Sequence, residues 1–370
     1  MATSVLSVAD LQKLLDALSD RGYEIVGPTI RNGAVAYQRM TSTAELPIGC
    51  EESQAGGHYR LRSTATKSLF SFVPGPESLK RFLFPPNNRL FQAHRQKASF
   101  AIEVPDDNPI PIVFLGPRAC EMSALAILDK ILLEGPYQSG PYRQRRQEAL
   151  IIAVNCTRAG DTCFCASMNT GPRVKGGYDI LLTEIAENGD PICLADPGTD
   201  RGEELLTELE LPDASEEQLA LADAAIARTE SAMGRTMNTD QLPDILWRSL
   251  DDREWEEVAS RCLNCGNCTM VCPTCFCTTT EDSTDLSGDT AVRVLRWDSC
   301  HNLDFSYIHG GSIRVSAMSR YRQWMMHKLA YWPEQFDAFG CVGCGRCITW
   351  CPVGIDITEQ AASIRESVSR

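Results

Sequence analysis

Cysteine is the residue that most constrains what this chain can fold into. Of its 17 cysteines, eleven lie between Cys262 and Cys351, and the other six are spread over the first 193 residues. A small secreted protein would use such a cluster for disulfides, but a chain of 370 residues can bury a core without them. We expect the thiols to stay reduced, and dense reduced cysteine indicates bound metal.

Two segments of the chain repeat one motif, Cys-x2-Cys-x2-Cys-x3-Cys-Pro. They are CLNCGNCTMVCP at 262–273 and CVGCGRCITWCP at 341–352. Three cysteines spaced two residues apart let a short turn wrap three corners of a 4Fe–4S cube. In two-cluster ferredoxins the fourth cysteine of such a run ligates the other cluster. The motifs therefore predict two 4Fe–4S clusters, one held by Cys262, Cys265, Cys268 and Cys351 and the other by Cys341, Cys344, Cys347 and Cys272.

Zinc is the alternative metal for these motifs, because Cys-x2-Cys pairs also make zinc sites. Zinc needs two such pairs, however, and has no use for a third cysteine two residues further on. Gly266 and Gly345 lie inside the two turns, where a missing side chain lets backbone N–H groups approach the sulfurs. A spacing that occurs twice favours iron–sulfur clusters over zinc.

Six further cysteines allow two interpretations each. They are Cys275, Cys277 and Cys300 in the second half of the chain, and Cys156, Cys163 and Cys165 in the first. The first three could form a third metal site or supply a replacement ligand, but eight thiolates already satisfy two cubes, which favours packing or weak hydrogen bonds. The second three could be a metal or redox site. Because Cys-x-Cys has no spaced partner pair nearby, we favour buried thiols there as well.

The charge balance of the chain is acidic, with 35 Lys and Arg against 49 Asp and Glu and a net charge of −14. A protein that binds nucleic acid through its phosphates would need a basic surface. No apolar run approaches the length of about 18 residues that indicates a membrane helix. The N-terminus lacks the basic and apolar segments of a secretory signal. We therefore expect a cytoplasmic protein that binds neither nucleic acid nor membrane.

Hydrophobic periodicity and turn residues predict a mixed α/β domain over the first 200 residues. A strand, a helix and a second strand follow one another there as a βαβ unit, so at least one strand pair is parallel. The predicted elements are a helix over Ser7–Asp20, a hairpin of Tyr23–Ile30 and Ala34–Met40 that turns at Asn32-Gly33, a strand near Tyr59–Arg62, surface turns over Pro74–Pro86, strands over Ser99–Val104 and Ile110–Leu115, a helix opened by Gly116-Pro117, and strands over Ala149–Val154 and Gly177–Ile185.

The second half of the chain is predicted to be mainly helical, with helices near Ser215–Met233, Gln241–Ser260 and Met318–Tyr331. The insertion between Cys272 and Cys341 is far longer than in a minimal ferredoxin, which favours clusters packed between helices. The fold class is therefore α+β, a mixed α/β domain followed by an α-helical ferredoxin-like domain with two 4Fe–4S clusters. We divide the chain into a docking domain at 1–200, a helical linker region at 201–250 and the two-cluster domain at 251–370.

No catalytic set can be assembled from the sequence. The five histidines have no ligand spacing and are expected to be structural. The segment 116–121 opens a helix after a strand, where a phosphate could bind, but it lacks the glycine pattern of a nucleotide site. The arginines at 143, 145 and 146 are expected at the surface. The aromatic residues between Trp297 and Trp332 are expected mainly in the core, with a smaller share at an interface.

Nine segments of the sequence carry a family resemblance. They are SLKRFLFPP at 78–86, GPRACEMSALAILDK at 116–130, YRQRR at 142–146, CFC at 163–165, GYDILLTEI at 177–185, CLNCGNCTMVCPTCFC at 262–277, RWDSC at 296–300, RYRQWMMHKLA at 320–330 and GCVGCGRCITWCPVGID at 340–356. In them the chain resembles the iron–sulfur beta subunit of cytoplasmic NAD(P)-linked nickel–iron hydrogenases (sulfhydrogenases), a family that also includes one of the subunits of anaerobic sulfite reductase. Family members often have Cys-Asp where Cys120-Glu121 stands here.

This resemblance implies two 4Fe–4S clusters on the eight motif cysteines, in an α-helical ferredoxin-like domain. It also implies the small and large subunits of a nickel–iron hydrogenase, together with a partner that binds flavin and NAD(P). We therefore expect an electron-transfer subunit that relays single electrons while cofactors of other subunits carry the catalysis. The alternatives are the corresponding subunit of an anaerobic sulfite reductase and a non-redox interaction protein with structural metal sites.

Overall fold

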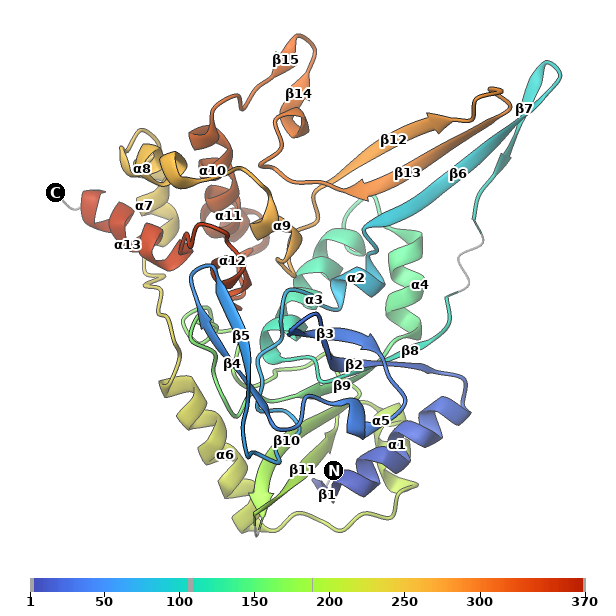
Figure 1. Ribbon diagram of the computed structural model, residues 1–370, viewed down its shortest axis with the longest axis vertical. Coiled ribbons are helices and arrows are strands. Elements are labelled where there is room, and N and C mark those ends of the chain that lie inside the picture. Colours follow the sequence, from blue (N-terminus) through green and yellow to red (C-terminus); the bar gives the residue numbers. More distant parts are fainter. Residues whose placement is uncertain (1–2, 106–108, 188, 369–370) are drawn as a thin grey trace.

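A seven-stranded sheet forms the centre of the first half of the chain (Figure 1). The computed structural model describes residues 3–105, 109–187 and 189–368. In sheet order the strands are β1 (Ser4–Leu6), β11 (Asp190–Pro197), β10 (Ile180–Glu187), β9 (Leu150–Val154), β8 (Ile112–Leu115), β2 (Glu24–Arg31) and β3 (Ala34–Arg39). Strands β10, β9, β8 and β2 are parallel to their neighbours in this series, and the outer pairs are antiparallel.

Helices cover both faces of this sheet because its buried strands are apolar on both sides. Val113 and Leu115 of β8 face one core, whereas Phe114 between them faces the other, as the two-residue repeat of a strand requires. The first core is closed by α1 (Val8–Asp20) and α5 (Asp200–Thr207), and the second by α3 (Ala119–Leu132) and α4 (Gly140–Glu148). Helix α6 (Glu216–Ser231) packs against β10 and β11.

Local patterns predicted several of these elements correctly. Helix α1 begins at the expected cap, where the backbone N–H of Asp10 donates to Ser7 Oγ at 3.2 Å and that of Ser7 returns a bond to the Asp10 carboxylate. The hairpin of β2 and β3 turns at Asn32-Gly33. The predicted βαβ unit is β8, α3 and β9, with its two strands parallel.

The prediction of surface turns over residues 74–86 is wrong. This segment contains α2 (Lys80–Leu83), and Leu79, Leu83 and Phe84 are buried in the second core. Its prolines suggested exposed turns, but the leucines four residues apart form an apolar helical face. Lys80 is buried as well, because its ammonium group donates to the carbonyl oxygens of Cys272 and Cys275 at 2.8 and 2.9 Å.

The single helix predicted over residues 241–260 is also wrong, because two helices stand there. They are α7 (Leu242–Arg248) and α8 (Glu254–Arg261). Local hydrogen bonds interrupt the helix between them. Trp255 Nε1 donates to the backbone carbonyl of Ser249 at 2.6 Å, and the backbone N–H of Glu254 donates to the Asp252 carboxylate at 2.9 Å. The side chain of aspartate often competes with the helical backbone in this way.

A second sheet combines segments from both halves of the chain and projects as an arm (Figure 1). Its order is β12 (Thr278–Thr284), β13 (Thr290–Trp297), β6 (Asn87–Gln96) and β7 (Ser99–Glu103), all antiparallel. Two smaller hairpins are β4 (Cys50–Ala55) with β5 (His58–Ser63), and β14 (Tyr307–Ile308) with β15 (Gly311–Ser312). The insertion between the cysteine motifs therefore contains strands as well as the expected helix.

The remaining helices gather around the two cysteine motifs. They are α9 (Asn267–Met270), α10 (Ala317–Met326) continued by a π turn over His327–Tyr331, α11 (Trp332–Phe336), α12 (Arg346–Thr349) and α13 (Ile357–Val368). Their core contains Tyr321, Trp324 and Trp255 together with several of the motif cysteines. Most aromatic residues of this region are thus core residues, as expected, whereas Tyr307 is exposed.

Buried polar contacts join the two halves of the chain. Arg346 of α12 is 4% exposed and donates to Glu121 of α3 at 2.9 Å, although 225 residues separate them. The hydroxyl of Tyr37 donates to the same carboxylate at 2.5 Å. The backbone N–H of Gly57, in the β4–β5 turn, donates to the carbonyl of Ile348 at 3.1 Å. These contacts hold α12 against the sheet domain.

We predict that Glu121→Gln destabilises the fold by about 3 kcal/mol, because the charge of Arg346 stays buried without its carboxylate. Glu24→Gln is the matched control, since its partner Arg39 is 75% exposed and such pairs contribute less than about 1 kcal/mol. Denaturant unfolding of both variants measures the difference. Equal losses would contradict the importance of the buried pair.

Candidate iron–sulfur site

Each cysteine motif builds the same backbone turn. Asn264 and Gly343, two residues after the first cysteine of each motif, have left-handed φ angles of 52° and 62°. Their N–H groups donate to the Sγ atom of that first cysteine at 3.4 and 3.5 Å. Gly266 and Gly345 follow with φ angles of 71° and 72° and lead into the short helices α9 and α12. The repeat seen in the sequence is thus a repeat in three dimensions.

Four motif cysteines line one cavity near the surface, and we call them the outer group. They are Cys262, Cys265 and Cys268 of the first motif and Cys351 of the second. Cys265 is exposed to solvent. Burial, and then the thiolates of Cys262 and Cys351, raise the pKa of Cys268. The fourth cysteine of the second motif therefore lies with the first three of the first motif.

The other four motif cysteines lie deeper, and we call them the inner group. They are Cys272 of the first motif and Cys341, Cys344 and Cys347 of the second. Burial, and then the neighbouring thiolates of this group, raise the pKa of Cys347 well above its usual value. Cys272 and Cys341 are each only 9% exposed. Because Cys347 also lines the cavity of the outer group, the two groups are adjacent.

A buried lysine places a positive charge beside the inner group. Lys328, in the π turn, is 5% exposed and donates to Cys272 Sγ and to Thr274 Oγ1, both at 3.2 Å. Burial by itself would lower its pKa, but the thiolates of Cys272, Cys275 and Cys341 raise that pKa well above the usual value. A buried ammonium group needs an anionic partner. The sulfur ligands of an iron–sulfur cluster fit this requirement, and so do the backbone N–H groups aimed at them.

A histidine lies beside the outer group, and the sequence did not reveal it. His301 Nε2 lies 3.4 Å from Cys268 Sγ, and its ring packs near Tyr321 and Trp324. Burial, with the nearby charge of Arg320, lowers the pKa of His301 to about 4, so the ring is neutral at pH 7. Its place directly after Cys300 in RWDSCH was the available clue.

The first half of the chain covers the second cysteine motif with the loop around Phe164. The backbone N–H of Phe164 donates to the carbonyl of Gly343 at 2.8 Å. A Cβ atom on Gly343 would lie 2.6 Å from the Phe164 oxygen, and one on Gly345 would lie 2.3 Å from the Thr162 oxygen. Both glycines are therefore required by close backbone contact as well as by φ.

The three other cysteines of the second half lie beside neighbouring thiols. Cys275 is next to Cys272 of the inner group, and Cys277 is next to Cys300. The neighbouring thiol of Cys275, together with the charge of Lys328, lowers the pKa of Cys272 well below its usual value. In the described part of the chain, no three His, Cys, Asp or Glu side chains converge as ligands of a single metal ion.

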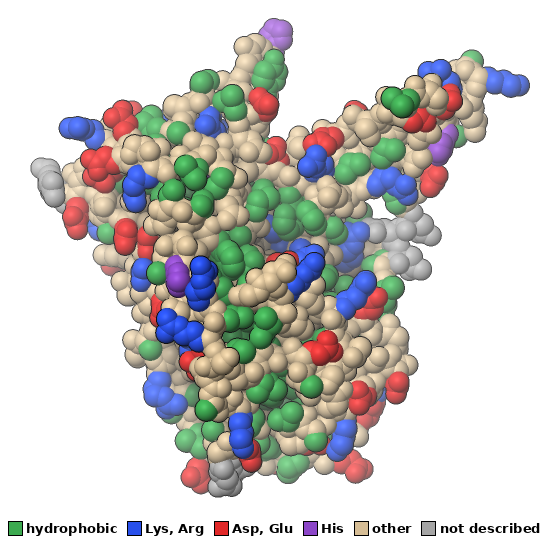
Figure 2. Space-filling view, viewed as in Figure 1, with side chains coloured by type: hydrophobic (Ala, Val, Ile, Leu, Met, Phe, Trp, Pro, Cys, Tyr) green, Lys and Arg blue, Asp and Glu red, His purple; other side chains and the backbone are tan. Residues whose placement is uncertain are grey.

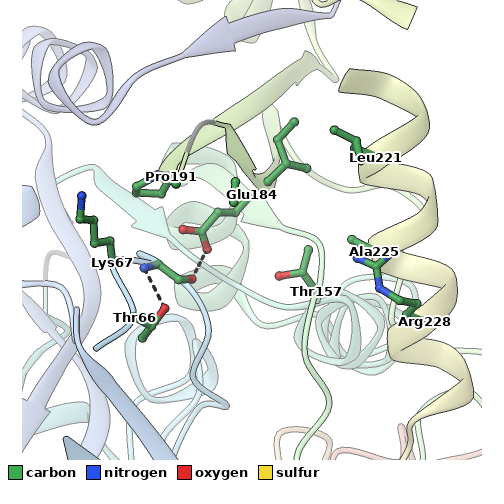
Figure 3. Close-up of a pocket in the computed structure, with 12 residues that line it drawn as sticks. Thr66, Lys67, Thr157, Glu184, Pro191, Leu221, Ala225 and Arg228 are labelled. Atoms are coloured by element: carbon green, nitrogen blue, oxygen red, sulfur yellow. Dashed lines mark hydrogen bonds between the residues drawn. The ribbon is translucent and has the colours of Figure 1, made fainter. Parts of the chain in front are cut away.

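A separate open cavity lies between β10, the loop at Thr66–Ser68 and helix α6 (Figure 3). Glu184 lies on its wall, and its carboxylate accepts hydrogen bonds from Ser68 Oγ at 2.7 Å and from the N–H groups of Leu69 and Phe70. The Glu184 carboxylate thus holds the loop at Ser68–Phe70 in place. The start of α3, considered as a phosphate site, is likewise occupied by the Glu121 carboxylate, which accepts from the N–H of Arg118 at 3.3 Å.

Comparison with known proteins agrees with this site. Residues 261–355 match the family described as a 4Fe-4S dicluster domain. Over 292 residues the chain is 31% identical to sulfhydrogenase 2 subunit beta of Pyrococcus furiosus, an alignment that covers 78% of this chain and 83% of that protein. No solved structure matches the chain. Within the described residues, no helix is long and apolar enough to cross a membrane.

The cysteine site and these matches define the class of the protein as an iron–sulfur electron-transfer protein. More narrowly, the chain belongs to the family of iron–sulfur beta subunits of sulfhydrogenases, as the sequence resemblance indicated.

We predict that Gly345→Ala disrupts the second motif, because the new Cβ atom would collide with the backbone of Thr162. Gly33→Ala is the matched control: its φ of 75° is nearly the same, but nothing lies within 4 Å of the added atom. The control should lose only about 1–2 kcal/mol from its left-handed backbone. The Gly345 variant should lose more and also retain less iron, measured by denaturant unfolding and iron analysis. Equal behaviour of the two variants would show that the contact with Thr162 is unimportant.

Proposed function

We propose that this chain relays single electrons through two 4Fe–4S clusters in a cytoplasmic NAD(P)-linked nickel–iron hydrogenase complex. The outer group would hold one cluster and the inner group the other. When bound, such clusters accept and release one electron at a time. The observation that carries the proposal is the exchange of fourth cysteines: Cys351 lies with the first motif and Cys272 with the second.

The different burial of the two groups supports an electron path between the interior of the protein and its surface. The inner group is enclosed between the helices and the sheet domain, whereas Cys265 and Leu263 of the outer turn are exposed, Leu263 by 62%. The thiols of the inner group are adjacent to those of the outer group through Cys347. An electron could thus pass between the interior and the surface along neighbouring ligands.

Exposed apolar side chains support a heteromeric complex. Phe100 and Ile102 on β7 are 62% and 67% exposed, and Ile308 at the β14–β15 hairpin is 55% exposed. Figure 2 shows hydrophobic side chains on the arm and on the face beside its base. Apolar patches of this kind often mark protein interfaces. The partners we propose are the small and large subunits of a nickel–iron hydrogenase, together with a flavin and NAD(P)-binding subunit.

We expect the native protein to co-purify anaerobically with these subunits. The isolated, iron-replete chain should accept electrons from dithionite. It should show no turnover of hydrogen or sulfite, because we assign no catalytic residues to this chain. Subunit identification and a hydrogen-dependent NAD(P) reduction assay test this. A partner with siroheme would favour the sulfite reductase alternative. Reduction of NAD(P) with hydrogen by the pure chain would contradict a relay.

The exchange of fourth cysteines predicts how serine variants group. Cys351→Ser and Cys265→Ser should perturb the EPR spectrum of the same cluster, and Cys272→Ser and Cys341→Ser that of the other, since each pair would share a cube. Cys50→Ser, in β4, is the control and should leave both spectra unchanged. If Cys351→Ser instead perturbs the cluster that Cys341→Ser perturbs, the exchange is wrong.

A further inference from the structure

Four cysteines in the first half of the chain line a second cavity rich in thiols. They are Cys120 in the first turn of α3, Cys156 just after β9, and Cys163 and Cys165 in the loop that covers the second motif. Cys120 and Cys156 follow the carboxyl ends of the parallel strands β8 and β9. This is the edge at which α/β sheets bind their ligands.

The cavity matches the one at the outer group in size and in the number of thiols. The two cavities are equal in size, at about 30 Å³ each. Cys344 of the inner group also lines it, and Cys163 Sγ lies 3.9 Å from the carbonyl oxygen of Cys344. The same donor set and the same space therefore recur directly beside the inner group.

A buried arginine on the cavity wall has no carboxylate partner among the described residues. Arg118 is 2% exposed, and its terminal nitrogens donate to the carbonyl oxygens of Phe70 and Phe72 at 2.6 and 3.1 Å and of Asn155 at 3.4 Å. Among the residues that the structure describes, its Nε atom has no hydrogen-bond partner. Burying a guanidinium charge is costly unless an anion is near. An anionic group in the cavity would supply one.

Two further arginines line the same cavity, and both are paired. Arg158 donates to Glu52 at 2.6 Å, and Arg346 donates to Glu121 at 2.9 Å. Arg118 differs from these two arginines. Among the described residues, the hydrogen bonds of its side chain go only to neutral carbonyl groups. The charge arrangement leaves room for an anionic group coordinated by thiolates.

We propose that these four thiols, which are Cys120, Cys156, Cys163 and Cys165, hold a third 4Fe–4S cluster. A single zinc ion would need the four sulfurs around one point. Within the described residues no three potential ligands converge in that way, either here or at the two motif groups. The ligands of a cubane cluster stand at separate corners instead. The spacing of Cys163 and Cys165 gave no hint of this, because their partners lie on other elements.

The third cluster would extend the relay into the sheet domain. Its ligands and Cys344 line one cavity, so an electron leaving one cluster would enter its neighbour directly, with one cluster oxidised as the other is reduced. This role, unlike the site itself, rests on the proposed function. The sheet domain would then carry part of the electron path in addition to docking partners.

Iron and acid-labile sulfide analysis of the anaerobically purified full chain tests the site. The unmodified chain should hold about twelve irons, from three cubes of four. Cys163→Ser/Cys165→Ser and, on a different element, Cys156→Ser should each hold about eight. Cys50→Ser should hold as many as the unmodified chain. EPR of the reduced variants should show the signals of the two motif clusters retained.

The outcomes separate this inference from the proposed function. About eight irons in the unmodified chain, unchanged by the Cys163→Ser/Cys165→Ser substitution, would overturn the third cluster and leave the two-cluster relay standing. One zinc ion that this substitution removes would also overturn it. A chain without iron would overturn both. Should the double variant fail to fold, the count on the unmodified chain and on Cys156→Ser decides.

Discussion

The contact between buried cations and the inner group of cysteines is the interaction on which the arrangement of this protein depends. Three cations from elements far apart in sequence meet the inner group: Lys80 from α2, Lys328 from the π turn and Arg346 from α12. Each would be costly to bury alone. Lys80 also lies 4.0 Å above the ring of Trp297. Lys328 donates to the sulfur of Cys272, Lys80 to a carbonyl oxygen of the first motif, and Arg346 to Glu121 of the sheet domain. These contacts stabilise the cysteine motifs and the sheet domain against one another.

The same arrangement explains why glycine and small loops surround the second motif. The inner group is enclosed only if the loop around Phe164 and the β4–β5 hairpin approach the α12 turn backbone to backbone. Tyr59 of that hairpin stacks on Trp350 with ring centroids 5.1 Å apart. In the part of the chain that the structure describes, the first motif has no backbone cover of this kind, and Cys265 is exposed. The two turns thus have the same backbone geometry but different exposure to solvent. Clusters held by them would therefore differ in reduction potential.

Local chemistry decided which parts of the structure were predictable. The cysteine turns, the cap at Ser7 and the hairpin at Asn32-Gly33 each depend on residues within a few positions of one another. The arm could not be foreseen, since β6 pairs with β13 across about two hundred residues and neither strand alternates cleanly. The burial of Lys80 is likewise decided by carbonyl oxygens of a distant motif. The division at 1–200, 201–250 and 251–370 stays a prediction, and the arm crosses it.

The cavity beside Arg118 shows why motif spacing is an incomplete guide to metal sites. In each motif a single turn would supply three of the proposed ligands, so the spacing alone indicates a cluster. In the sheet domain the parallel strands bring cysteines together in place of a turn. Strands β8 and β9 end side by side, which puts Cys120 and Cys156 at one edge of the sheet. When sheet topology brings the ligands together, the cysteines show no regular spacing in the sequence. The guanidinium of Arg118, which has no carboxylate partner among the described residues, is then the stronger indication, because a buried charge is costly without an anion nearby.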